Sequence, residues 1–230
     1  FFFARRYRAG NHSTSLGAGK KPVYSPNWEH GKMEELVWWA IPFEIVLILG
    51  ALTWSSTHAL DPRASLEGGA PLVVQVVALD WKWLFIYPEQ GIATVNYVGI
   101  PVGRPVRFEI TADAPMNSFW IPQLGGQIYA MTGMVNTLNL VANNAGTFKG
   151  LSANYSGEGF AQMKFVAVAT TPKEFDAWVQ AVKESPNLLQ ESEYRLLAAP
   201  SIANSVVYYG SVAEDLYRTI VSKFNYMHAH

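Results

Sequence analysis

The sequence predicts a membrane-anchored all-β protein, in which an N-terminal transmembrane helix is followed by a β-sandwich and by C-terminal helices. A mostly apolar stretch at residues 36–54 is long enough to cross the hydrocarbon core of a membrane. Short apolar segments separated by turn residues recur over residues 71–170, a pattern typical of a sandwich or barrel. Apolar residues at helical spacing then follow within residues 171–230.

The N-terminal part indicates how the chain is oriented in the membrane. Three phenylalanines run into basic residues, so we expect residues 1–4 to end an earlier transmembrane helix, mostly missing here, that would complete a hairpin. Residues 5–34 are loose and basic, which would suit nucleic acid, lipid headgroups or a cytoplasmic loop. Because basic residues are scarce in the segment after Trp54, the positive-inside bias favours the cytoplasmic loop and puts the rest of the chain outside, in the periplasm of a bacterium. The net charge of −1 gives no argument for nucleic acid.

Residues 35–55 are predicted to form the transmembrane helix, whose apolar stretch would be about 28 Å long. Pro42 removes one backbone hydrogen bond and should kink this helix, which neighbouring helices can compensate. The carboxyl of Glu44 is costly in hydrocarbon, so it either serves proton movement or lies against a polar patch of a partner subunit. Both interpretations favour a membrane partner.

Residues 56–70 are interpreted as a linker to the β domain of residues 71–170. The strands expected there are short and have no long helix between them. They cover residues 72–78, 84–87, 93–98, 106–111, 137–141 and 163–169. Four methionines of this domain are expected to fill gaps in its core, namely Met116, Met131, Met134 and Met163.

Residues 171–230 are predicted to be a helical extension. Thr171 and Glu174 form a capping box with proline at the first helical position, which indicates a helix start. Ser211 and Glu214 have the same spacing and are expected to open a second helix. These helices could hold partners or simply pack on the sandwich.

The residue types available exclude several kinds of chemistry. The chain has no cysteine, which rules out disulfides and thiol catalysis. No histidine lies between His58 and His228, so the β domain offers neither thiolate nor imidazole. Because soft copper centres require these ligands, we expect no metal site in the domain. No hydrolase triad or phosphate-binding loop is recognisable either.

The pattern Ser152-x3-Ser156-x3-Phe160-x2-Met163 resembles the copper loop of cytochrome c oxidase subunit II, where Cys-x3-Cys-x3-His-x2-Met binds two copper ions. With serines and phenylalanine at the cysteine and histidine positions, the chain resembles subunit II of the bacterial haem–copper quinol oxidases, which lack this centre. The resemblance implies a cupredoxin-like sandwich. The vestigial copper-site positions that it implies are Asn117, Ser152, Asn154, Ser156, Phe160 and Met163, where Asn117 replaces a histidine and Asn154 replaces an acidic residue that helps to bind magnesium.

The segment that begins Asp80-Trp81-Lys82-Trp83 also resembles the aromatic segment of oxidase subunit II. In the cytochrome c oxidases, an exposed tryptophan of this segment is the entry point for electrons. Without copper, an electron arriving there would have no acceptor. We therefore interpret Trp81 and Trp83 as packing or subunit-contact residues, since exposed aromatic side chains often anchor interfaces.

The resemblance implies a subunit of a bacterial inner-membrane oxidase that oxidises ubiquinol or menaquinol, reduces oxygen to water and pumps protons. This chain would hold no cofactor. The haems, the copper and the quinol site would belong to subunit I. The partners of this chain would be subunit I, further membrane subunits and the membrane lipid. Glu35 would lie at the mouth of a proton channel. An equally good interpretation is an ordinary acidic residue at the start of a helix, where the helix dipole favours a negative charge. Two alternatives are a copper-bearing subunit that accepts electrons from cytochrome c and a membrane-tethered binding module.

Overall fold

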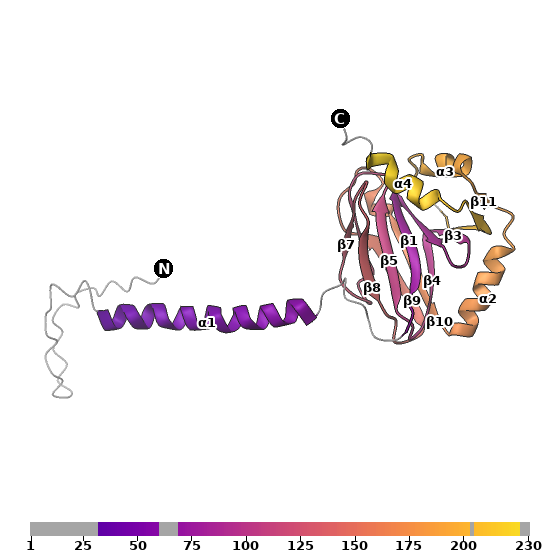
Figure 1. Ribbon diagram of the computed structural model, residues 1–230. Coiled ribbons are helices and arrows are strands. Elements are labelled where there is room, and N and C mark those ends of the chain that lie inside the picture. Colours follow the sequence, from indigo (N-terminus) through magenta and orange to yellow (C-terminus); the bar gives the residue numbers. More distant parts are fainter. Residues whose placement is uncertain (1–31, 60–68, 203–204, 226–230) are drawn as a thin grey trace, which may run out of the picture. The chain divides into compact units, whose positions relative to one another are not determined.

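The computed structural model describes residues 32–59, 69–202 and 205–225 (Figure 1). Contacts divide the chain into two compact units, Phe1–Ser56 and Thr57–His230. The predicted end of an earlier helix at residues 1–4, and all but the last residues of the predicted loop at 5–34, lie outside the described residues.

The described residues of the N-terminal unit belong to helix α1 (Lys32–Ala59), which includes Pro42 and whose last residues fall in the second unit. Its segment Glu35–His58 is long and apolar enough to cross a membrane, with a mean hydropathy of 2.0. The predicted span at residues 35–55 is therefore confirmed as a helix that extends further at both ends. The side chains described on α1 are exposed, Glu44 included. An exposed surface this apolar is expected where lipid or another protein covers it.

Two facing β-sheets form the sandwich of the second unit (Figure 1). The first sheet has the strand order β12-β3-β2-β1-β5-β8, and the second has the order β4-β10-β9-β6-β7. In chain order these strands are β1 (Leu72–Leu79), β2 (Lys82–Tyr87), β3 (Ile92–Val95), β4 (Tyr97–Pro101), β5 (Val106–Ala112), β6 (Asn117–Trp120), β7 (Ile128–Ala130), β8 (Asn136–Leu140), β9 (Gly146–Ser152), β10 (Lys164–Thr170) and β12 (Val207–Tyr209). The predicted all-β domain is confirmed, although β6, β7 and β9 were not expected from the apolar pattern.

Aromatic side chains from both sheets fill the space between them. The rings of Phe119 and Phe165 stack at 5.0 Å between centroids, and Trp83 meets the edge of Phe119 at 5.4 Å. Trp83 has no exposed surface. Of its two interpretations, packing therefore holds and subunit contact is wrong, because a side chain enclosed by both sheets cannot reach a partner.

The predicted strand at residues 93–98 is two strands that belong to different sheets. Asn96 separates them with a positive φ of 56°, a conformation that asparagine tolerates better than most residues. Its side-chain oxygen accepts a hydrogen bond of 2.9 Å from the backbone N–H of Trp83. The apolar pattern continues through this point, so only the backbone conformation reveals the change of sheet.

The C-terminal segment combines helices with strands. Helix α2 (Pro172–Lys183) has the predicted capping box, and α3 (Glu191–Ala198) and α4 (Leu216–Asn225) follow it. Residue Ser211 does not open a helix, because it lies in β13 (Ser211–Val212), which pairs with β11 (Leu188–Leu189). Strand β12 pairs with β3, so the C-terminal segment also completes a sheet of the sandwich. The predicted C-terminal helices are confirmed, and this segment also forms short strands that the helical spacing did not predict.

Candidate functional site

The candidate site is built around the end of β9, where it lies beside β6. The two strands are antiparallel neighbours, and this pairing brings Asn117 close to Ser152. The hydroxyl of Ser152 donates a hydrogen bond of 2.7 Å to Oδ1 of Asn117, and Nδ2 of Asn117 donates one of 2.8 Å to the carbonyl of Pro115. Both side chains are buried. Two positions that sequence reasoning singled out thus satisfy each other's polar groups.

The loop after β9 is closed by backbone contacts that bring Met163 to the same place. The backbone N–H of Ser152 donates to the carbonyl of Met163 at 3.1 Å, and the thioether side chain is buried. Nδ2 of Asn154 donates to the carbonyl of Met116 at 3.1 Å, which ties the loop to the start of β6. These hydrogen bonds join Asn117 and Met163 to Ser152, whose hydroxyl also lies 3.4 Å from the carbonyl of Asn154.

Ser156 and Phe160 have different surroundings. The Ser156 hydroxyl is buried and has no hydrogen-bond partner within the described part of the chain. Phe160 opens the short 3₁₀ helix η1 (Phe160–Gln162), and its half-buried ring meets the edge of Tyr155. Across residues 32–59, 69–202 and 205–225, no group of three or more His, Asp and Glu side chains could hold a metal ion.

Trp81 holds this loop from the neighbouring β1–β2 turn. Its indole N–H donates a hydrogen bond of 3.0 Å to the carbonyl of Ser156. A Cβ atom on Gly157 would lie 3.2 Å from the indole, and one on Gly159 would lie 2.4 Å from it, so the ring packs where only glycines leave room. Trp81 itself has a φ of 65°, which is costly for a bulky residue. The packing interpretation of Trp81 is thus supported by its contacts.

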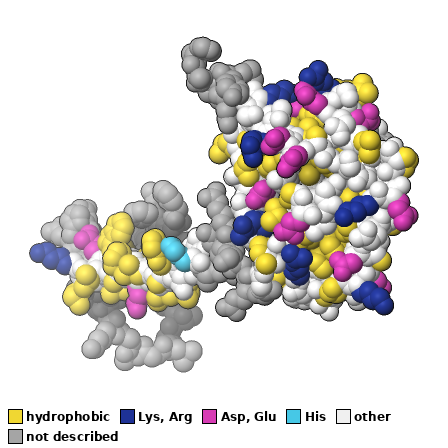
Figure 2. Space-filling view, turned by 45° about the vertical axis from the view of Figure 1, so that its right-hand side comes forward, with side chains coloured by type: hydrophobic (Ala, Val, Ile, Leu, Met, Phe, Trp, Pro, Cys, Tyr) yellow, Lys and Arg dark blue, Asp and Glu magenta, His cyan; other side chains and the backbone are white. Residues whose placement is uncertain are grey.

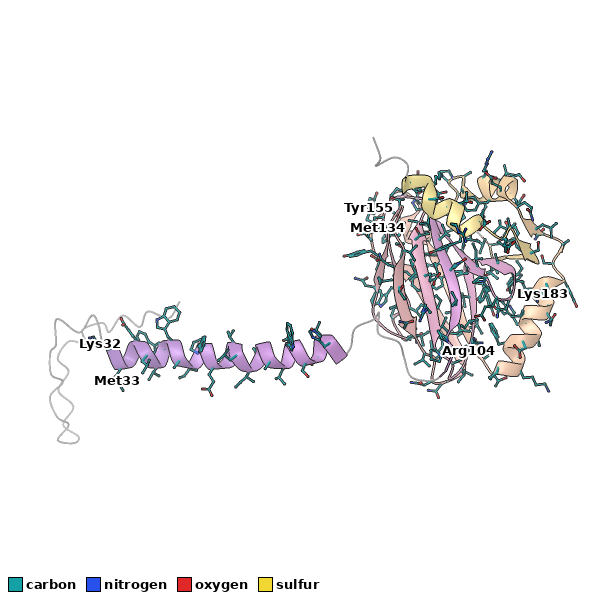
Figure 3. All side chains as sticks on the ribbon, viewed as in Figure 1. Lys32, Met33, Arg104, Met134, Tyr155 and Lys183 are labelled. Carbon is teal, nitrogen blue, oxygen red and sulfur yellow. The ribbon has the colours of Figure 1, made fainter. Side chains whose placement is uncertain are left out.

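An uncharged surface lies beside the loop. Residues 114–148 contain no Asp, Glu, Lys, Arg or His, although this segment supplies strands β6, β7 and β8 and their connections. Large apolar side chains are exposed on this segment and at the tip of the loop: Met116, Tyr129, Met134, Val135 and Tyr155. We call these five residues the uncharged face. Figure 3 shows Met134 and Tyr155 on one side of the domain and Lys183 of α2 on the other.

Sequence reasoning missed this face and misplaced two of its members. Met116 and Met134 were expected in the core, yet they are 42% and 50% exposed, whereas Met163 is buried as expected. Hydrophobicity alone cannot separate a buried methionine from one at an interface. The absence of charge over residues 114–148 was the available signal, because about a quarter of the residues of a typical soluble domain are charged.

Comparisons with known proteins give the family. Residues 89–170 match the family described as "Cytochrome C oxidase subunit II, periplasmic domain", and residues 183–228 match the "COX Aromatic Rich Motif". The cytochrome bo(3) ubiquinol oxidase subunit 2 of Pseudomonas putida is 51% identical over 98% of this chain and 69% of its own length. The chain belongs to the ubiquinol oxidase subunit 2 family. Subunit 2 of Acetobacter aceti ubiquinol oxidase is 49% identical over 97% of this chain and 71% of its own length.

Membership of the subunit 2 family confirms the resemblance seen in the sequence, and the family's periplasmic domain corresponds to the cupredoxin-like sandwich of the structure. A solved structure, the periplasmic domain of subunit II of Bradyrhizobium japonicum cytochrome oxidase, matches half of this chain and 96% of its own length with 23% identity and a TM-score of 0.48. The two family matches also separate the sandwich from the C-terminal segment near residues 170–183.

Proposed function

We propose that this chain is the non-redox subunit II of a proton-pumping quinol oxidase. In this proposal, partner subunit I carries the haems and copper, oxidises the quinol and reduces oxygen to water. The names of the relatives from Pseudomonas putida and Acetobacter aceti support the assignment to a ubiquinol oxidase. This chain would stabilise the complex without taking part in electron transfer.

The hydrogen bond between Ser152 and Asn117 is the observation that carries the non-redox assignment. A two-copper centre in this fold needs soft thiolate and imidazole donors. Here a hydroxyl donates to an amide oxygen, and both groups are already satisfied by protein partners. The other candidate donors are the hydroxyl of Ser156, unpartnered within the described residues, and the thioether of Met163, and neither is a thiolate or an imidazole. These residues do not fit a copper centre, so no electron-transfer step is assigned to them.

The division into two compact units supports the proposal of a membrane anchor and a separate periplasmic domain. Helix α1 would cross the inner membrane beside subunit I, and Glu44 would lie against a polar group of that subunit. The uncharged face of the sandwich has the composition of an interface core, which is poor in charge and rich in methionine and aromatic residues. We assign contact with the membrane subunits to this face.

Copper titration of the purified chain tests the non-redox assignment. The unaltered chain is expected to bind no copper tightly and to gain no visible absorption band. The variant carrying Asn117→His, Ser152→Cys, Ser156→Cys and Phe160→His is the positive control, because it supplies the missing donors on the same backbone. Two copper ions bound per unaltered chain would overturn the proposal.

Glu35 is proposed to contribute to the entrance of a proton channel, from its place in the first turns of α1. In the assembled oxidase, Glu35→Gln removes the charge while it keeps the shape, and we expect slower turnover and less proton release. Oxygen consumption and proton release are measured on the same preparation. If both stay at the level of the unaltered complex, Glu35 is only an acid at a helix start.

A further inference from the structure

Three consecutive residues in the β1–β2 turn connect two distant parts of the second unit. The carbonyl of Asp80 accepts a hydrogen bond of 3.2 Å from the backbone N–H of Ser201. Lys82 donates from Nζ to the carbonyl of Ala199 at 2.8 Å and to the hydroxyl of Ser201. Between these two residues, Trp81 holds the loop after β9 through its hydrogen bond to Ser156.

Lys82 needs the C-terminal segment because its ammonium is enclosed. The residue is only 2% exposed, and burial lowers the pKa of its ammonium, although the nearby Asp80 opposes this shift. A buried ammonium without hydrogen-bond partners is strongly unfavourable. The two oxygen atoms supplied by residues 199–201 therefore stabilise this position of Lys82, and with it the geometry of the turn.

The backbone conformation of Trp81 in turn depends on its two neighbours in the sequence being held in place. Its left-handed conformation is unfavourable for a tryptophan and persists only where the surroundings enforce it. Asp80 and Lys82, its two neighbours, are the residues held by the C-terminal segment. If they are released, the indole can leave its position over Gly157 and Gly159. The loop would then lose the side chain that packs on its glycines.

We propose that the C-terminal segment orders the loop after β9 through the Asp80–Lys82 turn, and that this order presents Tyr155 to the membrane partner. Lys82 and Trp81 are positioning residues in this proposal, since neither contacts the partner itself. Tyr155 is 76% exposed at the tip of the loop, and a rigid aromatic side chain loses little entropy on binding. The docking role of Tyr155 rests on the proposed function, whereas the ordering of the loop does not.

Hydrogen exchange of the full chain in detergent tests the ordering step. Lys82→Met keeps the length of the side chain and removes its ammonium. The amides of Phe160 and Gln162, which donate to Gly157 and Gly159, are expected to exchange about tenfold faster. Amides of β1 and β5 should keep their rates. Lys173→Met on the exposed surface of α2 is the matched control and should change none of these rates.

Ser201→Ala is a milder variant that tests the ordering of the loop if Lys82→Met does not fold. It removes one acceptor of the ammonium and should accelerate the same loop amides about fivefold. Faster exchange confined to residues 199–201, with the loop unchanged, would overturn the ordering step. In the Lys82→Met background, Trp81→Phe should add little further acceleration, because both act on one connection.

Retention of the variant chain by the haem-bearing complex is measured separately. A loosened loop with weaker retention supports the whole proposal. A loosened loop with unchanged retention overturns the docking role of Tyr155 and leaves the ordering step intact. The two readouts therefore separate a failure of this inference from a failure of the proposed function.

Discussion

The uncharged face and the C-terminal segment belong to one compact unit but have opposite surfaces. Residues 114–148 contain no Asp, Glu, Lys, Arg or His, and four of their large apolar residues are exposed, namely Met116, Tyr129, Met134 and Val135. The C-terminal segment carries surface ion pairs such as Glu191 with Arg195 at 2.6 Å and Asp215 with Arg218 at 3.5 Å. Figure 2, which brings the α2 side of the domain forward, shows acidic and basic side chains interspersed there with apolar ones.

In the proposed function, this difference separates a surface that water covers from one that a partner subunit would cover. Exposed ion pairs contribute little to stability, but their charges keep a surface solvated. An apolar face without charges gains free energy only when a partner removes it from water. The contrast teaches that, within one domain, the pattern of charge indicates docking better than hydrophobicity does.

The largest effect is expected from a charge placed on the uncharged face. Tyr155→Glu should leave the isolated chain as stable as before, because the side chain is exposed. In the complex it would bury an unpaired carboxylate, which costs roughly 3–5 kcal/mol and should abolish retention of the chain by the haem-bearing subunits. The ratio of this chain to haem after purification measures the loss.

Gln180→Glu adds the same charge to an exposed position of α2 and is the control. Its ratio to haem should equal that of the unaltered chain. Equal losses for both variants would contradict the contrast between the two surfaces, and retention of Tyr155→Glu would remove Tyr155 from the interface.

A smaller effect is expected from Gly159→Ala, which probes how tightly the loop beside the uncharged face is packed. The new methyl group would lie 2.4 Å from the Trp81 ring, and such overpacking costs about 1–3 kcal/mol. The free energy of unfolding in urea and the tryptophan fluorescence should both change. Gly126→Ala is the control, since a Cβ atom there meets nothing within 4 Å. Equal stability of the two variants would show that the indole does not fix the loop.

The smallest effect concerns the C-terminal segment at alkaline pH. Burial raises the pKa of the Tyr194 hydroxyl, which also donates to Asp113, and burial likewise raises the pKa of Tyr217. A raised pKa in the folded state means that the stabilisation is complete below the unfolded value of about 10 and is lost as the pH rises above it. We therefore expect α3 and α4 to loosen above about pH 10.

Hydrogen exchange or limited proteolysis across pH 8–12 would measure this loosening, with cleavage expected first within residues 183–225. Tyr194→Phe removes the titrating hydroxyl and about 1–2 kcal/mol of hydrogen bonding, so it should weaken the segment at neutral pH and flatten its alkaline dependence. Unchanged cleavage of residues 183–225 up to pH 12 would contradict this prediction.

Features that depend on neighbouring residues can be predicted from the amino-acid sequence alone. The apolar length of α1, the capping box of α2 and most strands of the sandwich follow from local periodicity and from local hydrogen bonds. The spacing from Ser152 to Met163 likewise identified the loop after β9 as the counterpart of the copper loop. Such signals need no knowledge of what lies across the molecule.

Residues with ambiguous local patterns could be assigned only once their contacts in the folded domain were known. Trp81 and Trp83 are two positions apart in the same aromatic stretch of the sequence. Trp83 lies in the core, whereas Trp81 packs on the loop after β9. Met116 and Met163 are both apolar, but only Met163 is enclosed by the two sheets. The physical reason is that burial and hydrogen-bond partners come from strands distant in sequence, whereas periodicity records only the neighbours along the chain.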